Sequence, residues 1–211
     1  GMALPIEQPV PPPSDFNWNL WLGPAPFRPY TPRITEPMNW RQVRDFSGGL
    51  LTDWGAHHVD EAMWALGLDD SGVSKVEVVK AVHPVAYEKG YAVDKNSYNV
   101  ATNFHVKCTC PGDVELNIVD FGENGITFEG SAGSIFVSRS QITLKGLPVD
   151  ALYKNPVSEA LLMKMRNGKR FDSHMGNFME CVRDRGKPIS DVFSHHRAMT
   201  TCHLGNIAMR L

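Results

Sequence analysis

The sequence lacks any long apolar run, and it lacks an excess of charge of one sign. No stretch approaches the roughly 18 consecutive apolar residues that mark a membrane-spanning helix, so no membrane partner is expected. The 21 lysines and arginines nearly balance the 23 aspartates and glutamates, which leaves a formal net charge of −2. This balance argues against a nucleic-acid partner, because such binding depends on neutralising phosphates.

Cysteine is also scarce, with four residues in a chain of 211. A domain of this size can bury enough apolar surface without disulfides, so the four are expected to be reduced thiols. Cys108 and Cys110 lie two residues apart, but without a second close pair they make a poor zinc site. His195, His196 and His203 have no carboxylate or cysteine at matching spacing. We therefore expect no metal site.

The chain is predicted to form a short extended lead-in followed by a single domain. Residues 1–14 include Pro9 and Pro11-Pro12-Pro13, which favour a polyproline-like conformation without a core. Residues 15–211 are expected to form one folded domain, because apolar residues are spread throughout. Gly1-Met2 resembles the remnant of a cleaved tag, so the compartment, cytoplasmic or exported, stays open.

Aromatic residues and prolines are dense between residues 15 and 40. The prolines forbid a regular helix or a central strand, whereas the tryptophans need burial, so an ordered arm or pocket wall is predicted. Arg28, Tyr30 and Trp40, with Arg41, are candidates for lining a sugar pocket. Aromatic faces stack on sugar C–H groups, and arginine donates to hydroxyls or carboxylates. A structural use of the aromatic rings is the alternative.

A helical pattern follows Gly48-Gly49 and runs to about Leu66. One side of this helix carries apolar or small residues: Leu51, Gly55, Val59, Ala62, Met63 and Leu66. Asp53 and His57 lie on the other side, about 40° apart on the helical wheel. A carboxylate one turn before a histidine can orient the imidazole for proton transfer near neutral pH. Spacing alone does not establish that role, since many such pairs are only solvated.

Six strands are predicted after this helix, at residues 75–82, 99–108, 114–121, 126–129, 135–139 and 141–144. Short connections indicate antiparallel pairing, and helices at 173–185 and 194–210 close the chain. The expected class is α+β, with a large open, predominantly antiparallel sheet and helices on one face. We expect a second subunit to cover the other face, and Phe104 and Val106 to face opposite sides.

The segment from Gly48 to Asp60, GGLLTDWGAHHVD, resembles the signature of the Gfo/Idh/MocA family, the glucose–fructose oxidoreductase and inositol dehydrogenase group. Residues 18–26, WNLWLGPAP, resemble the start of the C-terminal domain in a bacterial subgroup. Residues 128–135, FEGSAGSI, resemble a hairpin of the family's large sheet. Residues 177–188, which contain NFMECV and GKP, resemble its closing helices. The resemblance spans nearly the whole chain.

The resemblance implies the C-terminal domain of an NAD(P)-dependent oxidoreductase acting on a sugar, polyol or derivative. His57 matches the catalytic histidine that handles the substrate hydroxyl proton while hydride passes to nicotinamide, and Asp53 matches its supporting carboxylate. His58 and Asp60, beside this motif, are candidates for binding the substrate together with Arg28, Tyr30 and Trp40. Because the family's open sheet often builds subunit contacts, a homo-oligomer through the sheet is expected.

Two parts of the family pattern are missing. No Gly-x-Gly occurs, so the glycine loop that places pyrophosphate on a helix N-terminus is absent. The Glu-Lys-Pro with the family's catalytic lysine is absent too, because Glu88-Lys89-Gly90 lacks the proline and follows the histidine motif. We therefore expect a missing N-terminal Rossmann half, no cofactor bound by this chain alone, and NAD or NADP only in the full-length protein. This chain alone is expected to be inactive.

Two other functions stay open on the sequence. Some members of the superfamily use bound NAD transiently for glycoside cleavage, and the same residues are compatible with that reaction. A free-standing, non-catalytic sugar-binding or assembly domain is the third possibility, in which the sheet serves as an interface. The presence of both Asp53 and His57 speaks against this third function.

Overall fold

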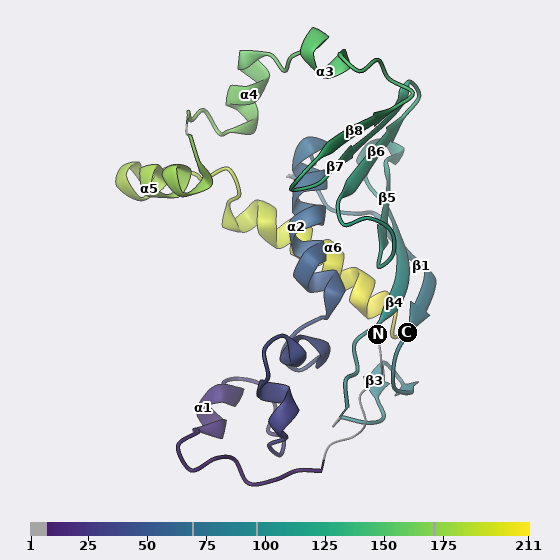
Figure 1. The fold of residues 1–211 in the computed structure, drawn as a ribbon, viewed down its shortest axis with the longest axis vertical. Coiled ribbons are helices and arrows are strands. Elements are labelled where there is room, and N and C mark those ends of the chain that lie inside the picture. Colours follow the sequence, from purple (N-terminus) through teal and green to yellow (C-terminus); the bar gives the residue numbers. More distant parts are fainter. Residues whose placement is uncertain (1–7, 69, 96, 171) are drawn as a thin grey trace.

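The computed structural model describes residues 8–68, 70–95, 97–170 and 172–211. Its centre consists of two long helices, α2 (Leu50–Ala65) and α6 (Val192–Ala208), beside a three-stranded antiparallel sheet (Figure 1). The strands are β1 (Lys75–Val82), β4 (Asn103–Thr109) and β5 (Glu115–Val119), in the order β1-β4-β5. The α+β class and the antiparallel pairing predicted from the sequence are confirmed.

The main hydrophobic core lies between this sheet and the two helices. Phe104, Val106 and Cys108 of β4 are all buried, because alternate residues of a strand face the same side. The expectation that Phe104 and Val106 face opposite sides is therefore wrong. Leu51 of α2 and Cys202 of α6 complete the centre of the core. Burial raises the pKa of Cys108 to about 11 and that of Cys202 to about 12, so both thiols stay protonated.

The outer face of the same sheet is largely polar. Lys75 pairs with Glu77 at 2.9 Å, Lys107 pairs with Glu115 on the neighbouring strand, and His105 is hydrogen-bonded to Asn117. Val82 and Val119 on the same face are 46% and 36% exposed, so this face also carries some apolar surface. The second subunit expected on this face stays a prediction.

The remaining strands form two separate sheets and not one large sheet. The strands β6 (Ile126–Gly130), β7 (Gly133–Val137) and β8 (Ile142–Lys145) pair in sequence order, and β2 (Tyr87–Glu88) pairs with β3 (Tyr91–Ala92). Asp120 marks where the first sheet ends. Its carboxylate accepts hydrogen bonds from the Phe104 backbone N–H at 2.7 Å and from the Asn103 side chain. The Asp120 carboxylate thus accepts the hydrogen bond of the Phe104 N–H in place of a backbone carbonyl of the neighbouring strand.

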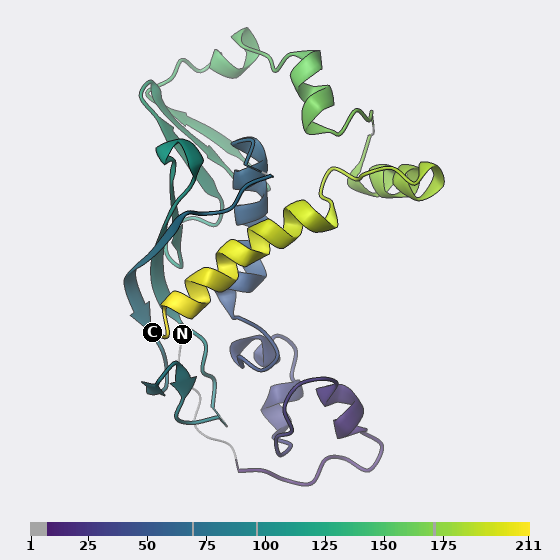
Figure 2. The ribbon, with the colours of Figure 1, turned by 180° about the vertical axis from the view of Figure 1, so that it is seen from behind.

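Residues 16–46 form a small unit at the end where α2 begins, which we call the aromatic cap (Figure 2). It contains α1 (Trp18–Leu22) and two short 3₁₀ helices, η1 (Pro32–Thr35) and η2 (Asn39–Gln42). Its interior is a second cluster of buried residues: Trp18, Leu22, Tyr30, Ile34 and Val43. The predicted ordered arm is thus built around aromatic packing. Residues 8–14 of the predicted lead-in are exposed, and residues 1–7 lie outside the described part.

The segment between β8 and α6 carries three helices that extend away from α2 and α6 (Figures 1 and 2). They are α3 (Ala151–Lys154), α4 (Glu159–Met165) and α5 (His174–Asp184), and a further 3₁₀ helix, η3 (Pro111–Asp113), precedes β5. One side of α5 exposes an apolar stripe: Met175, Phe178, Met179 and Val182. No helix in the described ranges is long and apolar enough to cross a membrane.

Candidate functional site

The start of α2 is held in place by Gly48 and Gly49. The Gly48 N–H donates to the Thr52 hydroxyl at 2.9 Å, and the Asn206 amide of α6 donates to the Gly48 carbonyl at 2.9 Å. A Cβ atom on Gly48 would collide with Asn206 and Thr52, whereas one on Gly49 would lie 2.6 Å from Val100. Gly49 also has φ 71° and ψ −157°, a conformation open only to glycine. The glycine pair therefore fixes the position of α2 against its neighbours.

The same glycines do not form a cradle for phosphate. A phosphate-binding glycine loop needs open space and unused N–H groups. Here the space is filled by Asn206, Thr52 and Val100, and the Gly48 N–H is already bonded. The helices α5 and α6 begin with Ser173 and Asp191, whose side chains accept hydrogen bonds from their first N–H groups.

Asp53 and His57 lie one turn apart on α2, but they do not contact each other through a hydrogen bond among the described residues. His57 is exposed, and its ring lies edge-on to Trp54 with 6.2 Å between the centroids. The Asp53 carboxylate accepts a hydrogen bond from Arg41 Nη1 at 2.7 Å, and both side chains are 28% exposed. A guanidinium binds a carboxylate more strongly than a neutral imidazole does. Asp53 is therefore held by the aromatic cap.

His58 faces a different neighbour from His57. Its Nε2 lies 2.7 Å from Asn124 Oδ1, just before β6, and its ring stacks on Trp54 at 5.9 Å. The Arg139 guanidinium, after β7, lies 4.9 Å from the centre of the Trp54 ring. These contacts join α2 to the β6-β7-β8 sheet. His58 thus lies away from Asp53, as the helical wheel predicts.

Asp60 links α2 to the beginning of α6. Its carboxylate accepts a hydrogen bond from the Ser190 hydroxyl at 3.2 Å, and it lies 3.4 Å from His195 Nδ1. The Asp60 carboxylate and the His195 imidazole thus help to hold α2 and α6 together. No group of three or more metal-ligating side chains is found within the described residues.

Arg28 and Tyr30 belong to the interior of the aromatic cap. Tyr30 is 9% exposed and packs edge-on against Trp18 at 5.2 Å. Arg28 is 6% exposed, and its guanidinium lies 5.8 Å from the centre of the Phe46 ring. Burial lowers the pKa of Arg28, while Asp45 and Asp94 act in the opposite direction. The packing of Tyr30 fits the alternative given in the sequence analysis, a structural use of the aromatic rings.

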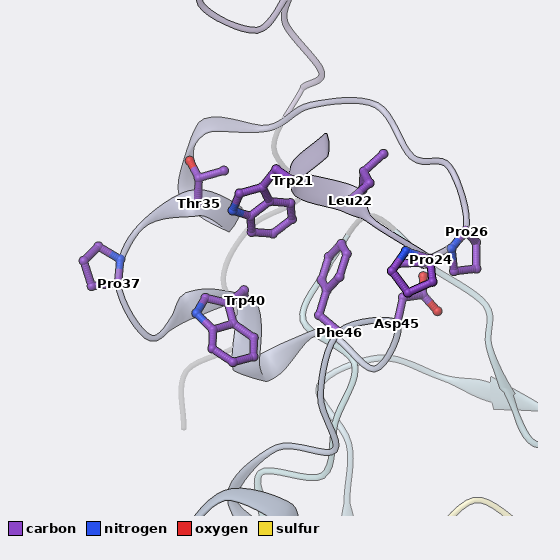
Figure 3. A pocket seen from close by; sticks show the side chains of 10 residues that line it. Trp21, Leu22, Pro24, Pro26, Thr35, Pro37, Trp40, Asp45 and Phe46 are labelled. Atoms are coloured by element: carbon purple, nitrogen blue, oxygen red, sulfur yellow. The ribbon is translucent and has the colours of Figure 1, made fainter. Parts of the chain in front are cut away.

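Trp40 has the opposite placement, because it lines a groove on the surface of the aromatic cap (Figure 3). The groove has a volume of about 600 Å³ and is lined by Trp21, Leu22, Pro24, Ala25, Pro26, Thr35, Pro37, Trp40, Asp45 and Phe46. The sequence reasoning named Trp40 but missed Trp21, Asp45 and Phe46 as lining residues. Trp21 lies in the segment dense in aromatic residues and prolines, which was its only signal, whereas Asp45 and Phe46 lie beyond that segment. Arg41, the next residue after Trp40, is the partner of Asp53.

The amino-acid sequence matches the model of a known family. The family model described as oxidoreductase family, C-terminal alpha/beta domain, matches residues 4–137. The match contains the aromatic cap, α2 with Asp53 and His57, the first sheet and the β6–β7 hairpin. No curated protein matches the chain. The chain belongs to the C-terminal alpha/beta domain family of the Gfo/Idh/MocA oxidoreductases.

Proposed function

We propose that this domain is the substrate-binding half of an NAD(P)-dependent oxidoreductase that acts on a sugar, polyol or derivative. The observation that carries the proposal is the placement of His57. It lies exposed on α2, in the segment that resembles the family's histidine motif, and its ring nitrogens have no hydrogen-bond partner among the described residues. A substrate hydroxyl can therefore approach the ring without displacing a protein contact.

In this proposal His57 removes the proton of a substrate hydroxyl during oxidation and returns it during reduction. Histidine suits the task because its neutral and charged forms are both accessible near neutral pH. Asp53 supplies negative charge one helical turn away, and Arg41 fixes the position of that carboxylate at 2.7 Å. His58 and Asp60, which already have protein partners, would shape the site from the side. The nicotinamide would supply the hydride acceptor from a different domain.

The nucleotide is assigned to a separate Rossmann domain for two reasons. The glycine pair before α2 has no open space for phosphate, because Asn206, Thr52 and Val100 fill it. The apolar stripe of α5 is exposed, from 47% at Met179 and Val182 to 66% at Met175, and exposed apolar surface of this kind normally meets a partner. We propose that the nucleotide-binding domain covers this stripe. A homo-oligomer through the sheet is a further proposal, for which Val82 and Val119 offer exposed apolar surface on the outer face of the first sheet.

The function can be tested with the enzyme in which this domain is joined to a nucleotide-binding domain. We expect it to reduce NAD⁺ or NADP⁺ with at least one member of a panel of sugars and polyols, as measured by the absorbance of the reduced nicotinamide. The His57→Ala enzyme from the same preparation is the matched control. Cleavage of a nitrophenyl glycoside without net nucleotide reduction would contradict the oxidoreductase and support the NAD-dependent glycosidase instead.

A further inference from the structure

The groove of the aromatic cap has the chemistry of a sugar-binding site. The indoles of Trp21 and Trp40 both line it, and the Phe46 ring stands beside them (Figure 3). Trp21 is fixed by stacking on Trp18 at 4.9 Å and by edge contact with Phe46 at 5.0 Å. Trp40 is 36% exposed although it is a large apolar side chain. Rigid and partly exposed indoles of this kind offer flat faces to a ligand.

Two polar groups at the groove can accept hydrogen bonds. Asp45 lines the groove and can accept hydrogen bonds there, although its charge also acts on the buried Arg28. The Thr35 hydroxyl donates to the Pro32 carbonyl at 2.8 Å, which leaves its oxygen free to accept. A neutral sugar ring fits this combination, because its C–H faces stack on indoles and its hydroxyls donate hydrogen bonds.

The groove lies beside the His57 region without being part of it. Neither Asp53 nor His57 lines it. Trp40 does line it, and the Arg41 guanidinium lies 5.5 Å from the Trp40 ring and binds Asp53 at 2.7 Å, so Arg41 connects the groove to the first turn of α2. A ligand that occupies the groove and also reaches His57 must therefore extend past Asp53. The volume of about 600 Å³ suits a bound group of substantial size.

We propose that this groove is a subsite for a sugar ring outside the reacting one, so that the substrate is a glycoside or an oligosaccharide and not a free monosaccharide. The proposal that a sugar binds in the groove rests only on the geometry of the groove. The conclusion about the substrate rests on the proposed function, because it requires that the chemistry takes place at His57.

Binding is tested on the 211-residue chain with cellobiose, maltose and methyl β-D-glucoside as probes, by tryptophan fluorescence and calorimetry. We expect at least one probe to bind with a dissociation constant on the order of millimolar. Trp40→Ala should weaken that binding about 10-fold, because one stacking face is lost, whereas Trp40→Phe should retain most of it. Trp64→Phe is the matched control, since Trp64 donates to the Met165 carbonyl and does not line the groove.

His57→Ala separates the two proposals. Groove binding that survives His57→Ala but not Trp40→Ala supports the subsite, even if turnover in the enzyme later proves independent of His57. If none of the three probes binds at a concentration of roughly ten times the expected dissociation constant, the subsite proposal is overturned. Equal binding by Trp40→Ala and the unaltered chain would overturn it as well. In the enzyme, a kcat/KM for glucose equal to that for a bound disaccharide would refute the conclusion about substrate size.

Discussion

Replacing His57 with alanine is expected to lower kcat by roughly 10²–10⁴-fold in the enzyme that contains this domain, the usual contribution of general acid–base catalysis. His57 is exposed on α2 and makes no hydrogen bond within the described residues, so its removal should leave the fold intact. Affinity for NAD(P) should remain nearly unchanged, because the nucleotide is expected on another domain. Steady-state kinetics at saturating nucleotide, with a separate measurement of nucleotide affinity, would check both statements.

His58→Ala is the matched control for this experiment, since it removes the neighbouring imidazole. His58 is hydrogen-bonded to Asn124 at 2.7 Å, so its loss should act mainly on KM or have little effect. Asp53→Asn should slow turnover less than His57→Ala, because the imidazole remains while the charge held by Arg41 is lost. If His58→Ala or a change at His195 abolished activity while His57→Ala left turnover intact, the assignment of the histidine would be wrong.

Gly49→Ala is expected to reduce the free energy of unfolding by about 3 kcal/mol or more, from two sources. The backbone at φ 71° and ψ −157° is strained for any residue with a side chain, and the new Cβ would lie 2.6 Å from Val100. Both effects act at the start of α2, so the placement of Asp53 and His57 should suffer with stability. Urea denaturation of the 211-residue chain, followed by far-UV circular dichroism, would measure the loss.

Gly67→Ala provides the comparison for Gly49→Ala. Gly67 also has a positive φ, 68°, but nothing lies within 4 Å of the position its Cβ would take. Only backbone strain should then act, at a cost of about 1 kcal/mol. If the two substitutions lowered the free energy of unfolding equally, the contact with Val100 would contribute nothing to the loss.

The sequence predicts elements well where one face of an element is buried. The alternation around Phe104 corresponds to β4, and the apolar stripe around Val59 corresponds to α2, since each pattern repeats with the period of its element. Strand 75–82 agrees with β1 at both ends. The number of sheets was not predictable in the same way. The first sheet ends at Asp120, whose carboxylate bonds to a residue 16 positions away in the sequence, a contact that no local pattern shows.

The candidate site was also predictable from the sequence only in part. The motif from Gly48 to Asp60 placed Asp53 and His57 on one side of a helix, which the structure shows. A helical wheel describes only one element, so it could not reveal that Arg41 of η2 binds Asp53. The density of aromatic residues indicated a pocket wall in the aromatic cap. It could not distinguish Tyr30, which is buried inside, from Trp40, which lines the groove.

Calorimetric titration of the 211-residue chain with NAD and with NADP tests the central claim most directly, namely that this domain provides the substrate side and that the nucleotide is held elsewhere. We expect no measurable binding of either nucleotide at micromolar concentrations, because Asn206, Thr52 and Val100 fill the space around the glycine pair at the start of α2. A micromolar dissociation constant for either nucleotide would contradict the account, since the chain would then hold the cofactor by itself.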